Sequence, residues 1–464
     1  MIYLSAQPDD LYFLWQLELQ IYNFSALGIP KEQIHVLVGY DPKKGLHPFF
    51  QRFRQENHRA TVFAYADNRK QNKYLSSIRP YLIAAHLKQH PELESETLFY
   101  HDSDIIFRCL PDWDLLTKGP AWYVSDTRTY LDTRYILSQT TENVFRKMCE
   151  IVGIAPERVK EADADAGGAQ YVFKSCTAGF WEKVERDCEE MYAYLYAEAQ
   201  RQGRYNPLKD GGLQLWCTDM WVVWWNALLE NREMRIHPLL DFCWANDPLD
   251  RWDATCILHY TGNSKRDKKA FDKSKYTHVS PFYADLSEID PGTCSIRLAE
   301  EIRRYKENLL DARRPRLEDA TLVYVQPSAG EPFSPCLRRL ALRYLDMAVC
   351  YTTETTWKAD GRALATPYCF VCRDAWLCTP EVLLRMLEEV RRHPSAEIHF
   401  HYPAFRLDPL GRQIFSFLLE EGYLSENRGK MRAEEKPLEI VAYASPVQER
   451  EAQHLYMDEP VYIF

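Results

Sequence analysis

Short apolar runs alternate with segments of helical periodicity over the first 125 residues, and this alternation restricts the possible folds more than any other feature. The helical segments cover residues 11–27 and 73–88, and the apolar runs cover residues 2–6, 35–40, 60–66, 97–100 and 121–125. Strands separated by helices form mostly parallel, doubly wound sheets, because a parallel neighbour requires a crossover connection. We therefore expect an α/β fold whose ligand site lies beyond the carboxyl ends of the strands.

A polar, proline-containing stretch at residues 311–319 predicts a domain boundary. We expect a larger Rossmann-like domain over residues 1–310 and a smaller α+β domain over residues 320–464, because 464 residues exceed the usual size of one domain. Thr218 is the expected N-cap of its helix. Further helices are predicted at residues 141–152, 181–199, 218–229, 298–310, 379–390 and 413–421, and further strands at residues 169–173, 255–258, 321–325, 368–372 and 397–400.

Charge and segment composition narrow the function classes. A formal net charge of −10 without a long basic block argues against a nucleic-acid partner, because phosphate neutralisation requires clustered Lys and Arg. The N-terminus lacks a signal-peptide pattern, and no apolar run approaches the ~18 residues of a transmembrane helix. The 13 cysteines follow no disulfide framework. These features favour a cytoplasmic protein without a transmembrane segment.

Two patterns in the C-terminal half could suggest a zinc site and a membrane-binding surface, but both have a simpler explanation. Cys369, Cys372 and Cys378 precede His399 and His401, but this spacing fits no standard closed zinc site. The arginines between residues 303 and 316 are interspersed with Glu and Asp, which favours a solvated helix face over a membrane-binding one.

The strongest chemical motif follows the fourth predicted strand. Asp102 and Asp104, separated by Ser103, come directly after apolar residues 97–100, and apolar residues 105–107 follow them. Two carboxylates at a strand end face a crevice, and Mg²⁺ or Mn²⁺ prefers oxygen ligands that it shares with substrate phosphates. The motif therefore indicates a divalent-cation site. A solvated turn in which each Asp caps the following backbone is the alternative.

Three later motifs carry side chains that suit the same chemistry. Residues 163–171 combine two glycines, which let a ligand approach the backbone closely, with carboxylates and an amide. His259 ends a predicted strand, where it can complete a metal site. Asp219 lies in the first turn of a predicted helix, where it can act as a general base. Each motif also has a structural explanation: a loop entering a strand, a buried histidine, and a carboxylate favoured by the helix dipole.

In chain order, the runs D-S-D-I-I-F-R, A-G-G-A-Q-Y, T-D-M-W and L-H-Y-T-G resemble GT-A glycosyltransferases. Within them, the pattern is most similar to the peptidyl serine galactosyltransferase and hydroxyproline arabinosyltransferase group and its bacterial relatives, over about residues 1–285. The resemblance implies a GT-A fold and transfer of a sugar from a nucleotide-sugar, expected to be a UDP-sugar, to an acceptor hydroxyl. It also implies Mn²⁺ or Mg²⁺ as cofactor. The C-terminal domain and the lack of a membrane anchor differ from the plant enzymes, so the acceptor stays open.

The resemblance implies a role for individual residues. Asp104 and His259 would bind the metal, and Asp102 would contact the metal through water or the ribose. Asp219 would be the acceptor-side carboxylate, with Asp165 as a second catalytic candidate. The implied donor site comprises Ala6, Gln7 and Asp67 at the base, Lys73 and Arg79 at the ribose or diphosphate, Asp102 and Ser103 of the motif, and Gly167, Gly168 and Gln170 at the donor sugar.

Three other function classes fit parts of this pattern. A sugar nucleotidyltransferase should have a glycine-rich loop after the first strand, but residues 5–9 (SAQPD) contain no glycine. A haloacid-dehalogenase-like phosphatase has Thr or Val two residues after the second Asp, where this chain has Ile106. A non-catalytic protein that binds nucleotides or carbohydrates on the same scaffold is the third. An inverting transferase needs a base such as Asp219 and a retaining one does not, and the sequence leaves this choice open.

Overall fold

The computed structural model describes residues 1–204, 211–261, 269–277, 280–283, 286–313 and 319–326, followed by shorter stretches. These stretches are residues 348–353, 364, 366–373, 376–377, 380–402, 404–407, 431–433, 438–444, 452–456 and 461–463. The chain divides into two compact units, Met1–Ile302 and Arg303–Phe464. The helix predicted at residues 413–421 lies outside the described residues.

The first unit is built on a seven-stranded, mostly parallel sheet, as the sequence predicts. Its strand β7 is antiparallel to both neighbours, β4 and β6, whereas the other adjacent pairs are parallel. β1 lies between β2 and β4 in the interior of the sheet and is buried along almost its whole length. The strand order is β3 (Thr61–Ala66), β2 (Ile34–Tyr40), β1 (Ile2–Pro8), β4 (Thr97–Tyr100), β7 (Gly167–Lys174), β6 (Trp122–Asp126) and β8 (Met234–Ile236).

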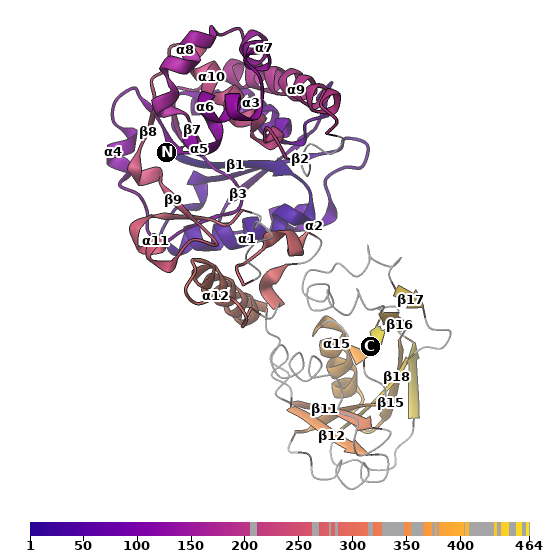
Figure 1. Cartoon of the computed structure of the whole chain (residues 1–464). Helices are drawn as coiled ribbons and strands as arrows, with labels where there is room; N and C mark the ends of the chain where they lie inside the picture. The colour runs from indigo at the N-terminus through magenta and orange to yellow at the C-terminus, as the bar shows by residue number, and fades with distance from the viewer. Residues whose placement is uncertain are drawn as a thin grey trace. The chain divides into compact units, whose positions relative to one another are not determined.

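Helices cover both faces of this sheet (Figure 1). α1 (Leu11–Ala26) lies on one side, and α3 (Ile78–Gln89), α9 (Ala178–Arg201) and α10 (Thr218–Leu229) lie on the other. α3 packs on β1, β2 and α9, and α10 packs on α9 and β7. Among the described residues, this unit also contains α2 (Pro48–Glu56), α4 (Trp113–Thr117), α5 (Arg128–Leu131), α6 (Thr133–Gln139), α7 (Glu142–Val152), α8 (Pro156–Glu161) and α11 (Leu249–Ala254). α12 (Ser295–Arg313) begins in this unit and continues into the second.

A small second sheet in the first unit was not predicted. It consists of β5 (Ile105–Phe107), β10 (Ile257–His259) and β9 (Phe242–Trp244), with β5 antiparallel to β10 and β9 parallel to it. The sheet joins the segment that follows the aspartate motif to two segments from much later in the chain. It therefore decides which late residues lie beside Asp102 and Asp104.

Two local predictions differ from the structure. The helix expected over residues 73–88 begins at Ile78, after a short 3₁₀ turn at Leu75–Ser77, and Pro80 lies in its first turn, where proline costs no hydrogen bond. The prediction that Thr218 is an N-cap is wrong. Thr218 already has helical dihedral angles, and its hydroxyl donates to the carbonyl of Leu215 at 2.7 Å instead of capping the helix.

The second unit is also a mixture of strands and helix. Its six-stranded sheet has the order β12 (Ala348–Thr353), β11 (Ala320–Gln326), β13 (Tyr368–Cys372), β18 (Leu438–Ala444), β15 (Glu397–Tyr402) and β19 (Ala452–Tyr456). α15 (Pro380–Arg392) packs on β18. A four-stranded sheet contains β14 (Trp376–Leu377), β20 (Val461–Ile463), β16 (Ala404–Leu407) and β17 (Met431–Ala433). Within the ranges given above, no helix has both the length and the apolar character to cross a bilayer.

Candidate active site

The aspartate motif occupies the link between the two sheets of the first unit. β4 ends at Tyr100, the motif follows, and β5 begins at Ile105. Asp104 is almost fully buried, with 3% of its surface exposed, whereas the side chain of Asp102 is 26% exposed. One carboxylate therefore lies inside the protein and the other at its surface, which is an arrangement that suits a ligand entering from solvent.

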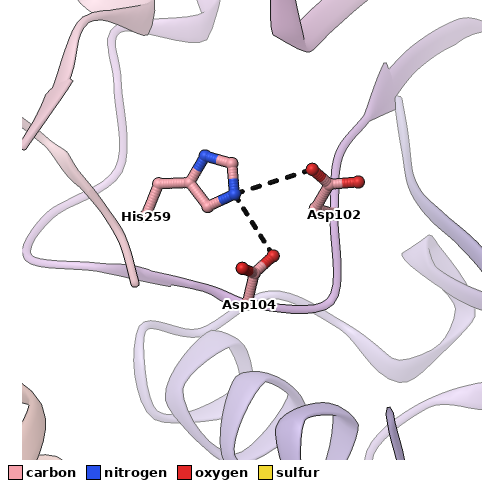
Figure 2. A group of neighbouring side chains, drawn as sticks. All are labelled: Asp102, Asp104 and His259. Carbon is pink, nitrogen blue, oxygen red and sulfur yellow. Dashed lines mark hydrogen bonds and ion pairs between the residues drawn. The ribbon is translucent and has the colours of Figure 1, made fainter. Parts of the chain in front are cut away.

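His259 reaches the motif through strand pairing. In the antiparallel pair of β10 and β5, His259 lies opposite Ile105, the residue after Asp104. Its Nε2 atom is 3.2 Å from Oδ1 of Asp104 and 3.6 Å from Oδ2 of Asp102 (Figure 2). The three side chains thus point toward one another. The ring of Trp244, on β9, stacks against the imidazole at 5.4 Å between ring centroids.

This trio can hold a divalent cation. Each of Asp102, Asp104 and His259 offers one ligand atom, and these atoms lie within 4.8 Å of one another. Two carboxylates and one imidazole form a donor set that suits Mn²⁺, and carboxylates also suit Mg²⁺, which usually keeps several waters. Each aspartate also pairs with a cationic side chain. The two carboxylates therefore already attract positive charge to the position where a metal ion would bind.

These two cations are Lys273 and Arg79. The ammonium group of Lys273 contacts Oδ2 of Asp104, and Nη1 of Arg79 lies 2.5 Å from Oδ1 of Asp102. Burial acts to raise the pKa of Asp104, but the charges of Lys273 and His259 outweigh it and hold the pKa well below its usual value. Burial likewise acts to lower the pKa of Lys273, and Asp104 reverses that effect and raises it. Both groups are therefore charged at neutral pH.

A row of buried amides on α1 fixes the backbone of the motif. Gln16, Gln20 and Asn23 follow one another at helical spacing, so they share one face. Gln16 accepts a hydrogen bond from the Ser103 hydroxyl at 3.0 Å, and Gln20 donates to the carbonyl of Asp102 at 2.8 Å. Asn23 exchanges two hydrogen bonds with the backbone of Phe107 in β5. Ser103 is therefore a structural member of the motif in this arrangement.

Gln170 lies behind the histidine. It is fully buried, and its side-chain amide is 3.2 Å from Nδ1 of His259. Its oxygen accepts a hydrogen bond from the Ser125 hydroxyl at 2.6 Å. A metal-binding histidine usually has such a partner on its other ring nitrogen, because that hydrogen bond fixes the tautomer and the ring orientation. Gln170, expected at the donor sugar, thus contacts a candidate metal ligand.

The trio lines a cleft of about 500 Å³. That volume is sufficient for a small organic ligand. Four donor-site candidates from the sequence, Ala6, Gln7, Arg79 and Ser103, lie in its wall with the trio. The remaining wall residues were not predicted, and they are Phe13, Gln16, Tyr130, Ala169, Trp216, Met220, Trp244, Thr261 and Lys273.

Asp219 is buried and is not among the described residues that line the cleft, but two contacts connect it to the site. Its Oδ2 is 3.6 Å from Nη1 of Arg79, and its Oδ1 accepts a hydrogen bond from the Tyr74 hydroxyl at 2.8 Å. Burial raises the pKa of Asp219, and Arg79 and Tyr74 only partly offset that effect. Arg79 therefore connects Asp219 to Asp102. The nearby Trp216 lines the cleft and is 47% exposed, which is unusual for so large an apolar side chain.

The other candidates occupy structural positions outside the described wall of the cleft. Asp67 forms an ion pair with Arg69 at 2.9 Å, and the backbone of Lys73 donates to Glu189. Asp165 accepts a hydrogen bond from the backbone of Ile236 at 3.0 Å. The two glycines, Gly167 and Gly168, allow close packing: a Cβ atom at Gly167 would lie 2.6 Å from the carbonyl oxygen of Ser125, and one at Gly168 would lie 2.5 Å from Met220.

Comparisons with known proteins give only distant likenesses. The sequence matches no protein-family model and no curated protein. Among solved structures, WbbM, a bifunctional glycosyltransferase, is similar at 9% identity and a TM-score of 0.35, over 65% of this chain and about half (51%) of its own. The galactosyltransferase LgtC, solved with donor and acceptor sugar analogs, has 13% identity and a TM-score of 0.32, over 65% of this chain and 95% of its own.

A third similar structure is mouse xyloside xylosyltransferase 1. It has 8% identity and a TM-score of 0.29, over 56% of this chain and 97% of its own. All three proteins are glycosyltransferases by name, but scores this low carry no argument about activity. None of the three belongs by name to the peptidyl serine galactosyltransferase and hydroxyproline arabinosyltransferase group, so the resemblance to that group stays a prediction.

Proposed function

We propose that this chain is a metal-dependent glycosyltransferase that transfers a sugar from a nucleotide-sugar, with a UDP-sugar the preferred donor, to an acceptor hydroxyl. The observation that supports the proposal most is the convergence of Asp102, Asp104 and His259 on the wall of one cleft. The cleft lies at the carboxyl end of β4, beyond a mostly parallel sheet, where such folds bind ligands. A donor diphosphate and the three side chains would share the cation.

The charge around the trio fits the departure of a nucleoside diphosphate. Negative charge develops on the diphosphate as the bond to the anomeric carbon breaks, and a bound Mn²⁺ or Mg²⁺ supplies Lewis-acid stabilisation of that charge. Lys273 forms an ion pair with one aspartate of the motif, and Arg79 forms an ion pair with the other. Each can move from its carboxylate to a phosphate oxygen, because either anion makes a charge-assisted hydrogen bond.

Ala6 and Gln7, at the end of β1, form the part of the wall that we assign to the nucleotide base. Gln7 donates to the carbonyl of Leu37 at 2.8 Å, so its side chain is held by the neighbouring strand. Asp67 and Lys73 keep their proposed donor-binding roles only if the nucleotide extends past the described wall. Their present contacts with Arg69 and Glu189 favour structural roles instead.

Asp219 is the proposed general base for an inverting reaction. Burial raises the pKa of its carboxyl group, which makes its anion a better proton acceptor than an exposed aspartate. The hydroxyl of Tyr74 and the guanidinium of Arg79 orient it. Trp216 precedes it by three residues, and its exposed indole at the cleft can stack on an acceptor sugar. A carbohydrate acceptor therefore fits this side of the cleft best.

The test is thermal denaturation of the full chain with UDP, with and without Mn²⁺. A ligand that binds only the folded state raises the melting temperature. We expect UDP to stabilise the chain only when Mn²⁺ is present, and we expect Asp104→Asn to abolish that effect. Asp114→Asn is the matched control, because Asp114 is 81% exposed on α4. A wild-type chain that does not respond to UDP with Mn²⁺ would contradict the proposal.

The same preparation distinguishes an enzyme from a binding protein. A glycosyltransferase transfers the sugar of its UDP-sugar slowly to water and faster to an acceptor hydroxyl, and it releases UDP in both reactions. A non-catalytic scaffold gives the Mn²⁺-dependent thermal shift without release of UDP from any UDP-sugar. The sugar nucleotidyltransferase is the remaining alternative, and it would instead release pyrophosphate from UTP and a sugar phosphate.

A further inference from the structure

Two cysteines face each other at one end of the small sheet. Sγ of Cys109 lies 3.4 Å from Sγ of Cys256, although 147 positions separate the two residues in the chain. Cys109 follows β5, and Cys256 directly precedes β10. Both are free thiols and partly exposed, so a small reagent can reach them from solvent. The proposed transfer reaction uses neither of them.

Backbone hydrogen bonds hold the two chain segments together at this point. Phe107 is paired with Ile257 in the antiparallel ladder of β5 and β10. Directly beyond that pair, the amide of Arg108 donates to the carbonyl of Cys256 at 2.8 Å, and its side-chain Nε donates to the carbonyl of Thr255 at 2.8 Å. The strand pairing, rather than a chance contact of two side chains, therefore brings the two thiols together.

Two other cysteines near this sheet differ in their burial. Cys243, on β9, and Cys294, just before α12, are both fully buried. Each thiol donates to a backbone carbonyl, Cys243 to Ile257 at 3.5 Å and Cys294 to Pro248 at 3.3 Å. Buried thiols in such surroundings are inert, because a reagent cannot reach them. Solvent access thus distinguishes the pair formed by Cys109 and Cys256.

We propose that Cys109 and Cys256 form a modification site, which an oxidant of the low-molecular-weight disulfide class, such as oxidised glutathione, converts to an intramolecular disulfide. The thiolate of one cysteine attacks the S–S bond of the oxidant, and a mixed disulfide forms as one thiolate leaves. The thiolate of the other cysteine then attacks the cysteine sulfur of the mixed disulfide and displaces the second thiolate. The oxidant gains two electrons and the two protons of the cysteines, and it leaves as two thiols.

The bond requires little movement and ties down one end of a strand pair. Side-chain rotation must shorten the separation of the sulfurs by ~1.4 Å, to about 2.05 Å. Asp104 precedes β5 and His259 ends β10, whereas the two cysteines lie at the opposite ends of these strands. The disulfide therefore keeps β5 and β10 from separating and protects the pairing that places His259 beside Asp104. Its formation needs neither a metal ion nor UDP.

The experiment treats the full native chain with excess oxidised glutathione, blocks the remaining thiols by alkylation and maps the disulfides by peptide mass. We expect a peptide that joins Cys109 to Cys256 and disappears on treatment with dithiothreitol. Cys350→Ser is the control and should form the same link, because Cys350 is a partly exposed cysteine of the second unit. Recovery of Cys109 and Cys256 as free thiols or as mixed disulfides with glutathione, without the joined peptide, would overturn the proposal.

A second measurement tests the effect of the bond on the fold. Oxidation should raise the melting temperature by several degrees, because a link across a long loop restricts the unfolded chain. It should also slow amide hydrogen exchange in β10, Ile257–His259, because the strand is tied to its neighbour. Neither change should occur in Cys109→Ser or Cys256→Ser, which cannot form the link. A rise of the same size in Cys256→Ser would contradict the proposal.

The proposed transferase activity is tested separately from this bond. Under reducing conditions, Cys256→Ser should unfold near the wild-type temperature, because serine replaces a partly exposed thiol with a group of similar size. The Mn²⁺-dependent thermal shift with UDP should also be the same in the reduced variant and in the reduced wild type. Failure of the disulfide to form therefore leaves the proposed activity untouched.

Discussion

Nε2 of His259 and Oδ1 of Asp104 lie 3.2 Å apart, although the two residues are separated by 155 positions in the chain. The backbone sets this distance: β10 pairs with β5, and the amide of Tyr260 donates to the carbonyl of Asp104 at 3.0 Å. Groups placed by strand pairing keep their geometry without a ligand, and such preorganisation lowers the cost of binding.

Lys273 competes with a cation for Asp104. We expect Lys273→Met to bind Mn²⁺ alone several-fold more tightly, because a like charge within a few ångströms of the cation is removed. The same variant should bind UDP more weakly at saturating Mn²⁺, because the diphosphate loses a cationic partner. Calorimetric titration measures both affinities. Lys275→Met, an exposed neighbour in the same turn, should change neither, and weaker binding of Mn²⁺ alone in Lys273→Met would refute this role.

Gln170 should control the affinity of the cation through His259. A neutral imidazole binds a metal through Nε2 only when Nδ1 carries the proton, so Nδ1–H needs an acceptor. Rotation of the Gln170 amide supplies it, since Ser125 can then accept from Gln170 and donate to the carbonyl of Leu240, 2.7 Å away.

Gln170→Met should therefore lower the Mn²⁺ affinity about 10–100-fold. Electron paramagnetic resonance of free Mn²⁺ measures the change directly. Gln170→Glu keeps an acceptor and should restore much of the affinity, which a purely space-filling role would not produce. Equal Mn²⁺ affinities in the Met variant and the wild type would show that the contact has no such role.

Replacement of Trp216 should weaken binding of the acceptor and leave binding of the donor unchanged. In Trp216→Ala, transfer of sugar to a panel of soluble oligosaccharides should fall at least tenfold, since stacking and apolar contact are both lost. Hydrolysis of the UDP-sugar by water should stay near the wild-type rate. The ratio of transfer to hydrolysis is the measurement, and Leu115→Ala, at another exposed apolar residue, is the control. A parallel fall of both rates would place Trp216 on the donor side instead.

A buried histidine pair should make the fold sensitive to acid. His86 is fully buried between Tyr65 and His35, and burial, together with His35 and His90, lowers its pKa to about 3. The unfolded chain takes up this proton near pH 6.5 and the folded chain does not, so the free energy of unfolding falls as the pH drops below 6.5.

At pH 5 the loss due to His86 amounts to about 2 kcal/mol relative to neutral pH. Chemical denaturation between pH 7.5 and pH 5 measures it. The variant His86→Gln keeps hydrogen-bonding groups but does not titrate, so its stability should depend less on pH over this interval. A pH dependence identical to that of the wild type would locate the effect elsewhere.

Gly167 should not tolerate a side chain. A Cβ atom there would lie 2.3 Å from Val124 and 2.6 Å from the carbonyl oxygen of Ser125, so the backbone of β6 would have to shift. Gly167→Ala should lower the free energy of unfolding by about 1–3 kcal/mol. Gly179→Ala on α9 is the control, because its nearest neighbour would be Thr177 at 3.8 Å. Equal stability of the two variants would contradict the close packing described here.

The elements with strong periodicity could be predicted from the sequence. The expected strand at residues 97–100 and the expected helix at residues 218–229 have those bounds in the structure. Two short elements could not be predicted: β5 and β9 have three residues each, too few for a periodic signal, whereas β10 overlaps the strand expected at residues 255–258. The N-cap at Thr218 failed because a 3₁₀ turn, Leu215–Cys217, runs directly into α10.

Some residues of the candidate site could likewise be predicted from the sequence, and others could not. Asp102 and Asp104 follow a predicted strand, so their position at the sheet edge could be inferred from local pattern. Lys273 and Trp216 have no local signal, because a charged residue in a loop and a tryptophan among many look ordinary in sequence. Their place in the cleft depends on contacts between distant segments, such as the one between Lys273 and Asp104.

The small sheet of β5, β9 and β10 also has a consequence for synthesis of the protein. A nascent chain that has emerged only through α10 contains both aspartates but not the imidazole that contacts both of them in the folded protein. Until residue 259 leaves the ribosome, β5 has no partner among β9 and β10, and the buried carboxylate of Asp104 lacks its contacts with His259 and Lys273. Ribosome-bound intermediates of this chain should therefore be unable to sequester a metal ion at these aspartates before translation of the first unit is nearly finished.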